Sequence, residues 1–288
     1  MTTLIADNTT LLRYIPNTLK SVAGEQTLFD KIEPHLIQSD RWLTQTFVSD
    51  ETMTHLVTTE SPTEEETSLL HHLRMATTAE AMLHAVPMLD LVLTPNGFGV
   101  VSNQNIAPAS KERVERLLSS LEKMRDDALN VVLTLLPNAY HWTASSQYEY
   151  FSATMLPWLD TVHDLGFSDH LWQHYQEIHT QLVALEECLA HDFFSTALMD
   201  TLRTANLLSQ WSLLVSPTEY RRLYQRIAAI EFSFLRIGEL PMPSIIDAVN
   251  IIRTSKSNLF SEWKTSDTAQ LFEPHGYTNK QKSGGFWL

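Results

Sequence analysis

Apolar residues recur along most of the chain at steps of three and four positions, the spacing that places side chains on one face of an α-helix. Glycine, which weakens helices, occurs only 8 times in 288 residues. The pattern predicts helices over residues 28–47, 111–136, 171–191 (continuing towards 211) and 245–263. Two further helices are expected after Ser61 and Ser216. The fold class expected from the sequence is therefore mainly α.

The tetrapeptide Ser-Pro-Thr-Glu occurs twice, at Ser61–Glu64 and Ser216–Glu219, 155 positions apart. In each copy the serine can cap a helix, the proline suits the first helical position, and the glutamate completes a capping box. Each box stands between an earlier and a later helix, and the later helices are expected to be capped by Ser110 and Ser244. We therefore expect two similar helical-bundle units in tandem.

The first unit is longer, because Ser110 and Ser244 are only 134 positions apart, 21 fewer than the two boxes. The additional residues include LVLTPNGFGVVS, from Leu91 to Ser102, in which apolar residues alternate on either side of Thr94-Pro95-Asn96-Gly97. This pattern predicts a β-hairpin at about 89–102, inserted in the first unit. Its two glycines do not fit a dinucleotide-binding loop, because Ser102 stands where a third glycine is needed.

The boundaries expected from these patterns divide the chain into four parts. Residues 1–136 form the first helical unit, residues 137–150 a linker, and residues 151–263 the second unit. Residues 264–288 form a polar, extended C-terminal tail with an aromatic end. Because that end is apolar, we expect it either to fold back onto its own chain or to dock on a neighbouring subunit.

The helix from Lys111 is expected to bury a narrow apolar seam. The residues of this seam are Val114, Leu117, Leu121, Met124, Ala128, Val131 and Leu135. Packing within the unit is the favoured interpretation, and an oligomer contact is the alternative.

Composition excludes several classes of protein. A formal net charge of −14 at pH 7 argues against a general nucleic-acid or anionic-membrane binder. Cys188 is the only cysteine, so an intramolecular disulfide or a cysteine-based zinc site is impossible. The sequence has no secretory signal pattern and no apolar stretch long enough for a membrane span. We expect a protein with no direct nucleic-acid specificity and no membrane association.

Histidine is frequent, so metal binding has to be considered. His170, His174 and Glu177 stand at the first, fifth and eighth positions of HLWQHYQE and would share one helix face. A partner Glu-x-x-His motif is missing, and His-Glu-x-x-His does not occur. A solvated polar face explains these residues as well. We expect no metal, no cofactor and no catalytic residues, with these three as the weak metal candidate.

Three segments, LIADNTTLLRYIPNTL (4–19), LFDKIEPHLIQSDRWL (28–43) and LVLTPNGFGVVSNQNIAPASKERVERL (91–117), resemble an uncharacterised family found in Bacteroidetes genomes, their prophages and phages. The ending Gly-Phe-Trp-Leu (285–288) is similar to the aromatic ends of that family. The resemblance implies a non-enzymatic virion structural protein, a head–tail connector or adaptor subunit.

Such a subunit would act through protein contacts, with itself in a ring and with portal or tail proteins. It would be in the host cytoplasm during assembly, and in the virion if phage-derived. The residues that we expect at these contacts are Asn96 and Phe98 in the hairpin and Phe286 and Trp287 in the tail. For Phe98, a core position on the hairpin's inner face is an equal alternative.

Two other functions stay open from the sequence. One is a cytoplasmic helical regulatory or ligand-binding protein with an apolar pocket between the repeated units. The other is a metal-dependent enzyme using His170, His174 and Glu177.

Overall fold

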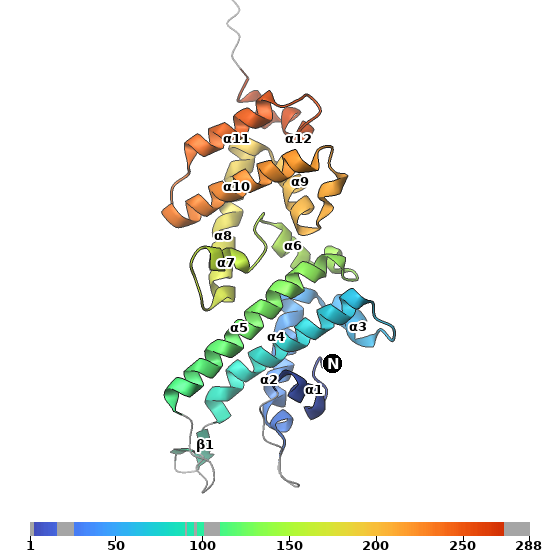
Figure 1. The fold of residues 1–288 in the computed structure, drawn as a ribbon, viewed down its shortest axis with the longest axis vertical. Helices are drawn as coiled ribbons and strands as arrows, with labels where there is room; N and C mark the ends of the chain where they lie inside the picture. Colours follow the sequence, from blue (N-terminus) through green and yellow to red (C-terminus); the bar gives the residue numbers. More distant parts are fainter. Residues whose placement is uncertain (1–2, 16–25, 90, 95–96, 101–109, 274–288) are drawn as a thin grey trace, which may run out of the picture. The chain divides into compact units, whose positions relative to one another are not determined.

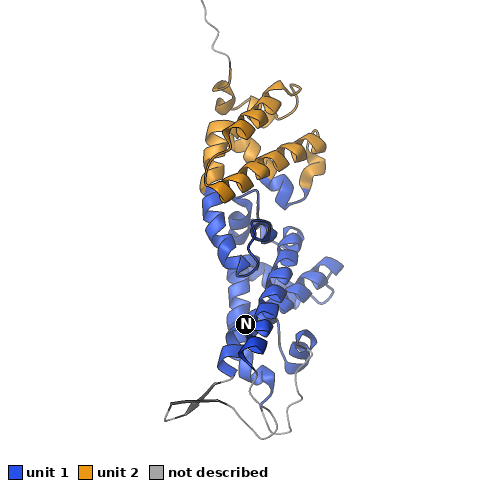
Figure 2. Ribbon diagram, turned by 60° about the vertical axis from the view of Figure 1, so that its left-hand side comes forward, with its two compact units in different colours: residues 1–183, 203–209 blue, residues 184–202, 210–288 orange. Residues whose placement is uncertain are grey.

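The computed structural model describes residues 3–15, 26–89, 91–94, 97–100 and 110–273 (Figure 1). The expectation of a mainly helical fold is confirmed. The chain divides into two compact units: unit 1 comprises residues 1–183 and 203–209, and unit 2 comprises residues 184–202 and 210–288 (Figure 2). These bounds differ from the expected ones, since the division falls within a helix, α8 (Leu171–Leu189), and not at residues 137–150.

Unit 1 is built mainly from helices. Its elements are α1 (Asn8–Tyr14), α2 (Leu28–Leu43), the π turn η1 (Thr44–Val48), α3 (Asp50–Thr58), α4 (Glu64–Leu89), β1 (Leu91–Thr94), β2 (Gly97–Val100), α5 (Lys111–Leu135), the 3-10 turns η2 (Leu136–Asn138) and η3 (Trp142–Ala144), α6 (Ser146–Ser152), α7 (Asp160–Asp164) and the first part of α8. The long helices α4 and α5 lie side by side, and α2 packs on α4 (Figure 1).

The core of unit 1 includes an apolar cluster that joins α1, α2, α4 and α5. Its buried members are Ile5, Leu11, Ile32, Leu36, Ala81, Met82, Ala85 and Leu121. Residues 137–150, expected as a linker, contain two short turns and Trp142, which is fully buried.

Ser110 and Ser216 occupy the predicted N-cap positions, although neither makes a side-chain capping hydrogen bond, and the other two predicted caps lie elsewhere. α4 begins at Glu64, and Thr63 is its cap: Thr63 Oγ1 accepts from the Glu66 backbone at 3.1 Å, and Glu66 accepts from the Thr63 backbone at 2.8 Å. The prediction of Ser61 was wrong because the same box pattern recurs two residues later. Ser244 is likewise not a cap, since α11 already begins at Met242 after Pro241.

The buried face of α5 also differs from the predicted seam. Leu121 and Ala128 are buried as expected, but Leu117 and Val131 are exposed. Leu129, Val132 and Leu133 are buried in their place. A straight helix of 3.6 residues per turn drifts away from a strict three-and-four alternation, so the buried face moves round the helix along its length.

A pair of short antiparallel strands lies between α4 and α5. β1 and β2 pair with Leu91 opposite Val100 and Thr94 opposite Gly97. The first strand begins at Leu91 and not at Leu89, because α4 continues through Pro87 to Leu89.

Unit 2 contains the rest of α8, the π turn η4 (Ala190–Phe194), most of α9 (Thr196–Leu207), the 3-10 turn η5 (Gln210–Leu213), α10 (Pro217–Ile237), α11 (Met242–Thr254), α12 (Ser261–Lys264) and α13 (Asp267–Gln270). The predicted helix 245–263 was too long, because α11 ends at Thr254, before the turn-forming sequence Ser255-Lys256-Ser257-Asn258. No helix of the described residues is long and apolar enough to cross a membrane.

Two series of elements share the same local features. The first series runs from α2 to α6, and the second from α8 to α13. In each, a long helix passes into a π turn and then into a serine with positive φ, Ser49 at 88° and Ser195 at 62°. The serine Oγ accepts from the backbone N–H three residues later, in Thr52 at 3.3 Å and in Leu198 at 3.4 Å, and so caps the next helix.

In each series a buried tryptophan donates a hydrogen bond to a backbone carbonyl of the π turn. The Trp142 indole N–H donates to the Phe47 carbonyl at 2.7 Å, and the Trp263 indole N–H donates to the Phe193 carbonyl at 2.7 Å. Both tryptophans are almost inaccessible to solvent.

The serine three residues after each tryptophan repeats its role. Ser145 and Ser266 each donate to the preceding tryptophan carbonyl at 2.6 Å, and each caps the next short helix. Each segment has one constant offset between the two series. Corresponding residues of the π turns are 146 positions apart, and corresponding residues of the tryptophan segments are 121 positions apart.

Candidate functional site

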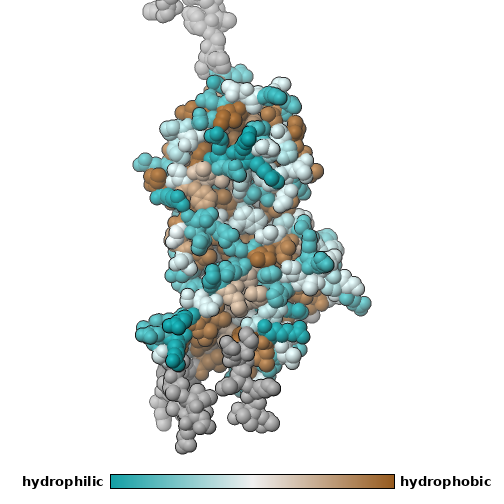
Figure 3. Space-filling view, in the orientation of Figure 1, coloured by the Kyte–Doolittle hydropathy of each residue, from teal (hydrophilic) through white to brown (hydrophobic). Residues whose placement is uncertain are grey.

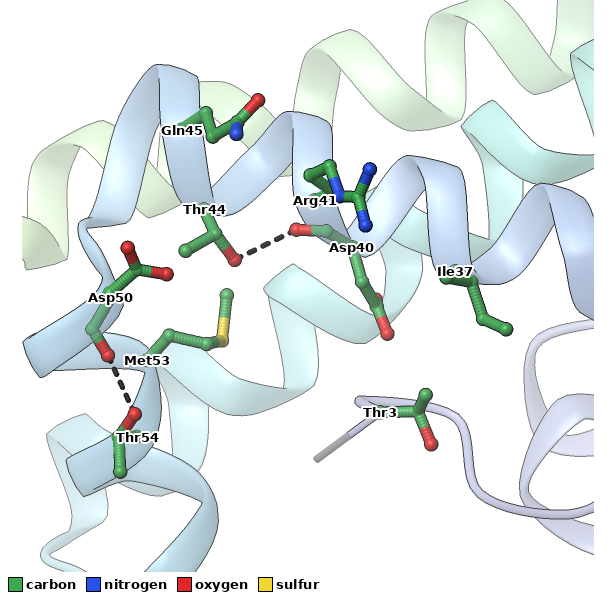
Figure 4. A pocket seen from close by; sticks show the side chains of 9 residues that line it. All are labelled: Thr3, Ile37, Asp40, Arg41, Thr44, Gln45, Asp50, Met53 and Thr54. Carbon is green, nitrogen blue, oxygen red and sulfur yellow. Dashed lines mark hydrogen bonds between the residues drawn. The ribbon is translucent and has the colours of Figure 1, made fainter. Parts of the chain in front are cut away.

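A cavity of about 380 Å³ opens in unit 1 where α2, η1 and α3 meet the N-terminal segment (Figure 4). Its walls include Thr3, Ile37, Asp40, Thr44, Asp50 and Met53. The main-chain turn at η1 and the capped start of α3 shape the wall, because they fold the chain back beside α2. The lining combines apolar and polar side chains, which is typical of small-molecule sites.

Asp40 is the central polar group of this cavity. Its carboxylate accepts from the Leu4 backbone N–H and from the Thr77 hydroxyl, both at 3.0 Å. The Arg74 guanidinium donates to the Leu4 carbonyl at 3.0 Å, so both polar groups of Leu4 are held. Burial raises the pKa of Asp40 to about 6, and the two hydrogen bonds partly offset this effect. A proton can therefore be gained or lost here near neutral pH.

A second polar group of unit 1 is centred on Arg125 of α5. The guanidinium contacts Glu80 at 3.0 Å, Asp126 at 2.8 Å and Glu122 at 3.5 Å, and all four side chains are mostly buried. Glu122 accepts in turn from His170, at 2.8 Å from the ring and 3.1 Å from the backbone. Burial raises the pKa of Asp126, and Arg125 partly offsets this. The group joins α4, α5 and the start of α8.

The three candidate metal ligands do not come together. α8 begins at Leu171, so His170 precedes the helix, at φ 49°, and binds Glu122. His174 stacks on Phe167 with ring centroids 4.1 Å apart, and its Nδ1 lies 3.6 Å from Glu177. Among the described residues, no group of three or more His, Cys, Asp or Glu side chains is placed to hold a metal ion.

Of the expected partner contacts, Asn96, Phe286 and Trp287 lie outside the described residues. Phe98 lies in β2, paired with Leu93 of β1.

Exposed apolar side chains stand on the two helices that lead into the β1–β2 hairpin. Met88 and Leu89 in the last turn of α4 are 62% and 38% exposed, and Leu117 near the start of α5 is 46% exposed. We call these three residues the hairpin base. Hydrophobic surface is visible in this lower part of the molecule, above the grey atoms (Figure 3). Exposed large apolar side chains are candidates for contacts with other proteins.

Sequence reasoning missed Asp40, Arg125, Met88 and Leu89, whereas Leu117 was assigned to the seam of the helix from Lys111. Asp40 and Arg125 stand among charged residues on helices whose neighbours in space are distant in sequence, such as Thr77 and Glu80. For Leu117 the sequence left open both packing within the unit and an oligomer contact, and the structure shows it 46% exposed.

Comparison with known proteins gives one family. Residues 15–152 match the family described as Family of unknown function (DUF6712). The match ends at Ser152, the last residue of α6 and of the first series. No curated protein and no solved structure matches the chain significantly.

Proposed function

We propose that the protein is a non-enzymatic structural subunit of a phage or prophage particle, a head–tail connector or adaptor. It works through protein–protein contacts, with further copies of itself in a ring and with portal or tail proteins. It assembles in the host cytoplasm and becomes part of the virion.

The observation that carries this proposal is the hairpin base. Met88, Leu89 and Leu117 expose apolar side chains on the helices that precede and follow the β1–β2 strand pair, where they would be covered in an assembly. Burying such side chains at an interface contributes roughly 25 cal/mol per Å² of apolar area. The type of particle comes from the likeness of this hairpin and its following helix to the phage and prophage family.

The two matched series support a duplicated helical unit in which only the first copy carries the hairpin. α4 and α5 are joined by residues 90–110, whereas α10 and α11 are joined by residues 238–241 alone. The family match to 15–152 covers one series and not the other. A hairpin in one of two copies gives the subunit a distinct contact end, as an adaptor between unlike partners requires.

The test is association of the full chain, measured by sedimentation over a range of protein concentrations and by negative-stain imaging. We expect concentration-dependent oligomers, with rings in the images. Replacing two residues of the hairpin base, Met88→Ser with Leu89→Ser, is expected to weaken association by about tenfold or more, since a tenfold change corresponds to only about 1.4 kcal/mol.

A matched control exists in unit 2. Leu213 and Val215 are 76% and 69% exposed, so Leu213→Ser with Val215→Ser removes at least as much exposed apolar surface elsewhere. This control is expected to associate as the unchanged chain does. A chain that stays monomeric at the highest concentrations, or equal weakening by both double variants, would contradict the proposal.

The cavity at Asp40 favours a second candidate, a cytoplasmic helical regulatory or ligand-binding protein. A volume of about 380 Å³ with a mixed lining suits a small organic molecule. A thermal-shift screen of small molecules tests this, with Met53→Trp as the variant that fills the cavity. A compound that stabilises the unchanged chain but not the Met53→Trp chain would support ligand binding.

A further inference from the structure

In the first series, aromatic residues that follow in the chain cover the rings at the π turn. Phe47 and Phe151 stack with centroids 5.7 Å apart, and both are fully buried. Trp172 of α8 lies 4.6 Å from Phe47, and Tyr175 lies 6.2 Å from Phe151. All of these residues belong to unit 1.

The second series repeats this surface. Phe193 and Phe272 occupy the positions of Phe47 and Phe151, 146 and 121 residues later, and their centroids are 6.4 Å apart. Trp263 lies 6.0 Å from Phe272, and all three residues belong to unit 2.

Part of this second surface is open to solvent. Phe193 and Phe272 are only half-buried, and Leu271 beside them is 65% exposed. Cys188, which stands at the position of Trp42 in the first series, is exposed as well. Within the described residues, Phe193 and Phe272 have ring contacts only with each other, Phe194 and Trp263, and nothing corresponds to Trp172 or Tyr175. We call Phe193, Leu271 and Phe272 the aromatic acceptor.

We infer that the C-terminal residues Phe286, Trp287 and Leu288 of the same chain bind the aromatic acceptor and cover it as Trp172 and Tyr175 cover its counterpart. The inference rests on the duplication proposed above, and not on the particle in which the protein works.

The sequence after Phe272 fits this occupant. Residues 274–288 continue directly from the acceptor, and residues 278–285 are polar or glycine before three large apolar residues end the chain. In the first series the covering tryptophan also follows its acceptor ring, 21 positions after Phe151. Three adjacent large apolar side chains, two of them aromatic, gain free energy when they cover an exposed aromatic surface.

The length of the segment and its effective concentration at the acceptor favour binding within one chain over binding to a neighbouring chain. Phe286 follows Phe272 by fourteen residues, and a chain of that length can extend to roughly 46 Å, well beyond the ring-to-ring distances in the first series. A segment tethered this closely has an effective concentration in the range of about 1 mM, far above that of a second chain in dilute solution.

Disulfide trapping tests the inference with the protein's own thiol. Cys188 belongs to unit 2 and stands at the position of Trp42, whose ring centroid lies 5.4 Å from that of Phe47, the counterpart of Phe193. Leu288→Cys adds a second thiol next to the anchors without removing Phe286 or Trp287. Burial and Asp192 raise the pKa of the Cys188 thiol, so the oxidation is run in alkaline buffer. We expect a disulfide within one chain, identified by its mass, by peptide mapping and by its mobility on a non-reducing gel.

Two controls in the full-length chain separate binding from chance encounter. Phe286→Ser with Trp287→Ser, in the Leu288→Cys background, keeps the length and both thiols but removes the anchors. Leu271→Asp in the same background places a charge on the acceptor at an exposed position. Both are expected to slow the disulfide by about tenfold, the factor that corresponds to about 1.4 kcal/mol of lost binding.

Hydrogen exchange of the amides in α12 and α13 gives a second readout. Exchange is expected to be faster in the chain with Phe286→Ser and Trp287→Ser than in the unchanged chain, because the acceptor loses its cover. Equal disulfide rates with and without the anchors would overturn the inference. So would a disulfide formed between two chains, which assigns the segment to a neighbour. Neither outcome bears on the hairpin base, which the association measurements test separately.

Discussion

The indole N–H of Trp142 donates a 2.7 Å hydrogen bond to the backbone carbonyl of Phe47, 95 positions earlier in the chain. The bond fastens the turn after α5 to the turn after α2, and it is buried. Trp263 makes the same bond to Phe193, 70 positions earlier. A buried carbonyl of a π turn has lost part of its regular helical pairing, so an indole donor satisfies a group that would otherwise be costly.

Replacing Trp142 by Phe should therefore destabilise unit 1 by about 3 kcal/mol, because the Phe47 carbonyl loses its donor and the core loses volume. Trp263→Phe should cost a similar amount in unit 2. Urea unfolding followed by far-ultraviolet circular dichroism measures both. The half-buried Trp158 supplies the control, and a Trp158→Phe cost as large as that of Trp142→Phe would contradict the role of the indole bond.

The serines after the π turns cap the next helix and have a positive φ angle, which is uncommon for residues other than glycine. Ser49 has φ 88°, and its Oγ accepts from the Thr52 backbone at 3.3 Å. Ser49→Ala removes the cap and keeps a side chain where glycine is favoured, so it should cost about 1–2 kcal/mol. Ser49→Gly loses the same bond but relieves the backbone, so it should cost less. Thermal unfolding of the two variants decides this, and an alanine variant as stable as the glycine variant would refute the explanation.

Arg125 lies between carboxylates in unit 1 that its charge compensates. Arg125→Met keeps much of the side-chain volume but leaves Asp126 and Glu80 mostly buried without their cation. We expect a loss of about 3 kcal/mol in the free energy of unfolding, because breaking one side of a buried ion pair strands the other charge.

The double variant Arg125→Met with Asp126→Asn should recover part of that loss, since it removes one stranded charge together with its partner. Denaturant unfolding of the two single variants, the double variant and the unchanged chain completes a double-mutant cycle. Additive losses would show that the two side chains do not interact as described.

Local sequence patterns predicted the positions of the helices more accurately than their first and last residues. Apolar periodicity located α2, α5, α8 and α10, because each buries one face. The capping box forms at Thr63 and not at Ser61, because Thr-Glu-Glu-Glu provides the same pattern two residues later. Thr63 is also the nearer of the two to the first buried residues of α4. Both copies of the tetrapeptide indicated a helix, but only the second gave its first residue, since α10 begins at Pro217 after Ser216.

Long-range pairings could not be predicted from the sequence. The bonds of Trp142 to Phe47 and of Asp40 to Leu4 and Thr77 join residues 36 to 95 positions apart. Asp40 in sequence is one acid in the polar run Gln-Ser-Asp-Arg, which predicts a solvated face. Only the packing of the N-terminal segment and α4 against α2 shows that its carboxylate is largely, though not wholly, shielded from water. The expectation that His170, His174 and Glu177 share one helix face was wrong, because α8 begins at Leu171 and His170 precedes it.

The raised pKa of Asp40 makes the stability of the fold depend on pH, and the direction of that dependence follows from linkage. Burial raises its pKa to about 6 in the folded chain, from the ordinary value of 3.8. The folded state then holds a proton that the unfolded state has lost, so the stability that Asp40 contributes is fully present below about pH 4 and declines as the pH rises through about 6. The Asp40→Asn variant lacks this decline. Between pH 4 and pH 7 its stability relative to the unchanged chain should therefore rise, by roughly 2 kcal/mol.

Asp30 provides a control of opposite sign. Hydrogen bonds from the backbone and side chain of Thr27 lower its pKa, so its contribution to stability is present above the ordinary pKa and is lost as the pH falls. Asp30→Asn should accordingly lose most stability at pH 7 and little at pH 3, whereas Asp40→Asn should gain relative stability towards pH 7. Urea unfolding of both variants from pH 3 to pH 8 measures the two curves. If the Asp40→Asn curve ran parallel to that of the unchanged chain, the carboxyl of Asp40 would titrate as an ordinary solvated acid, and its place as the buried anchor of Leu4 would be wrong.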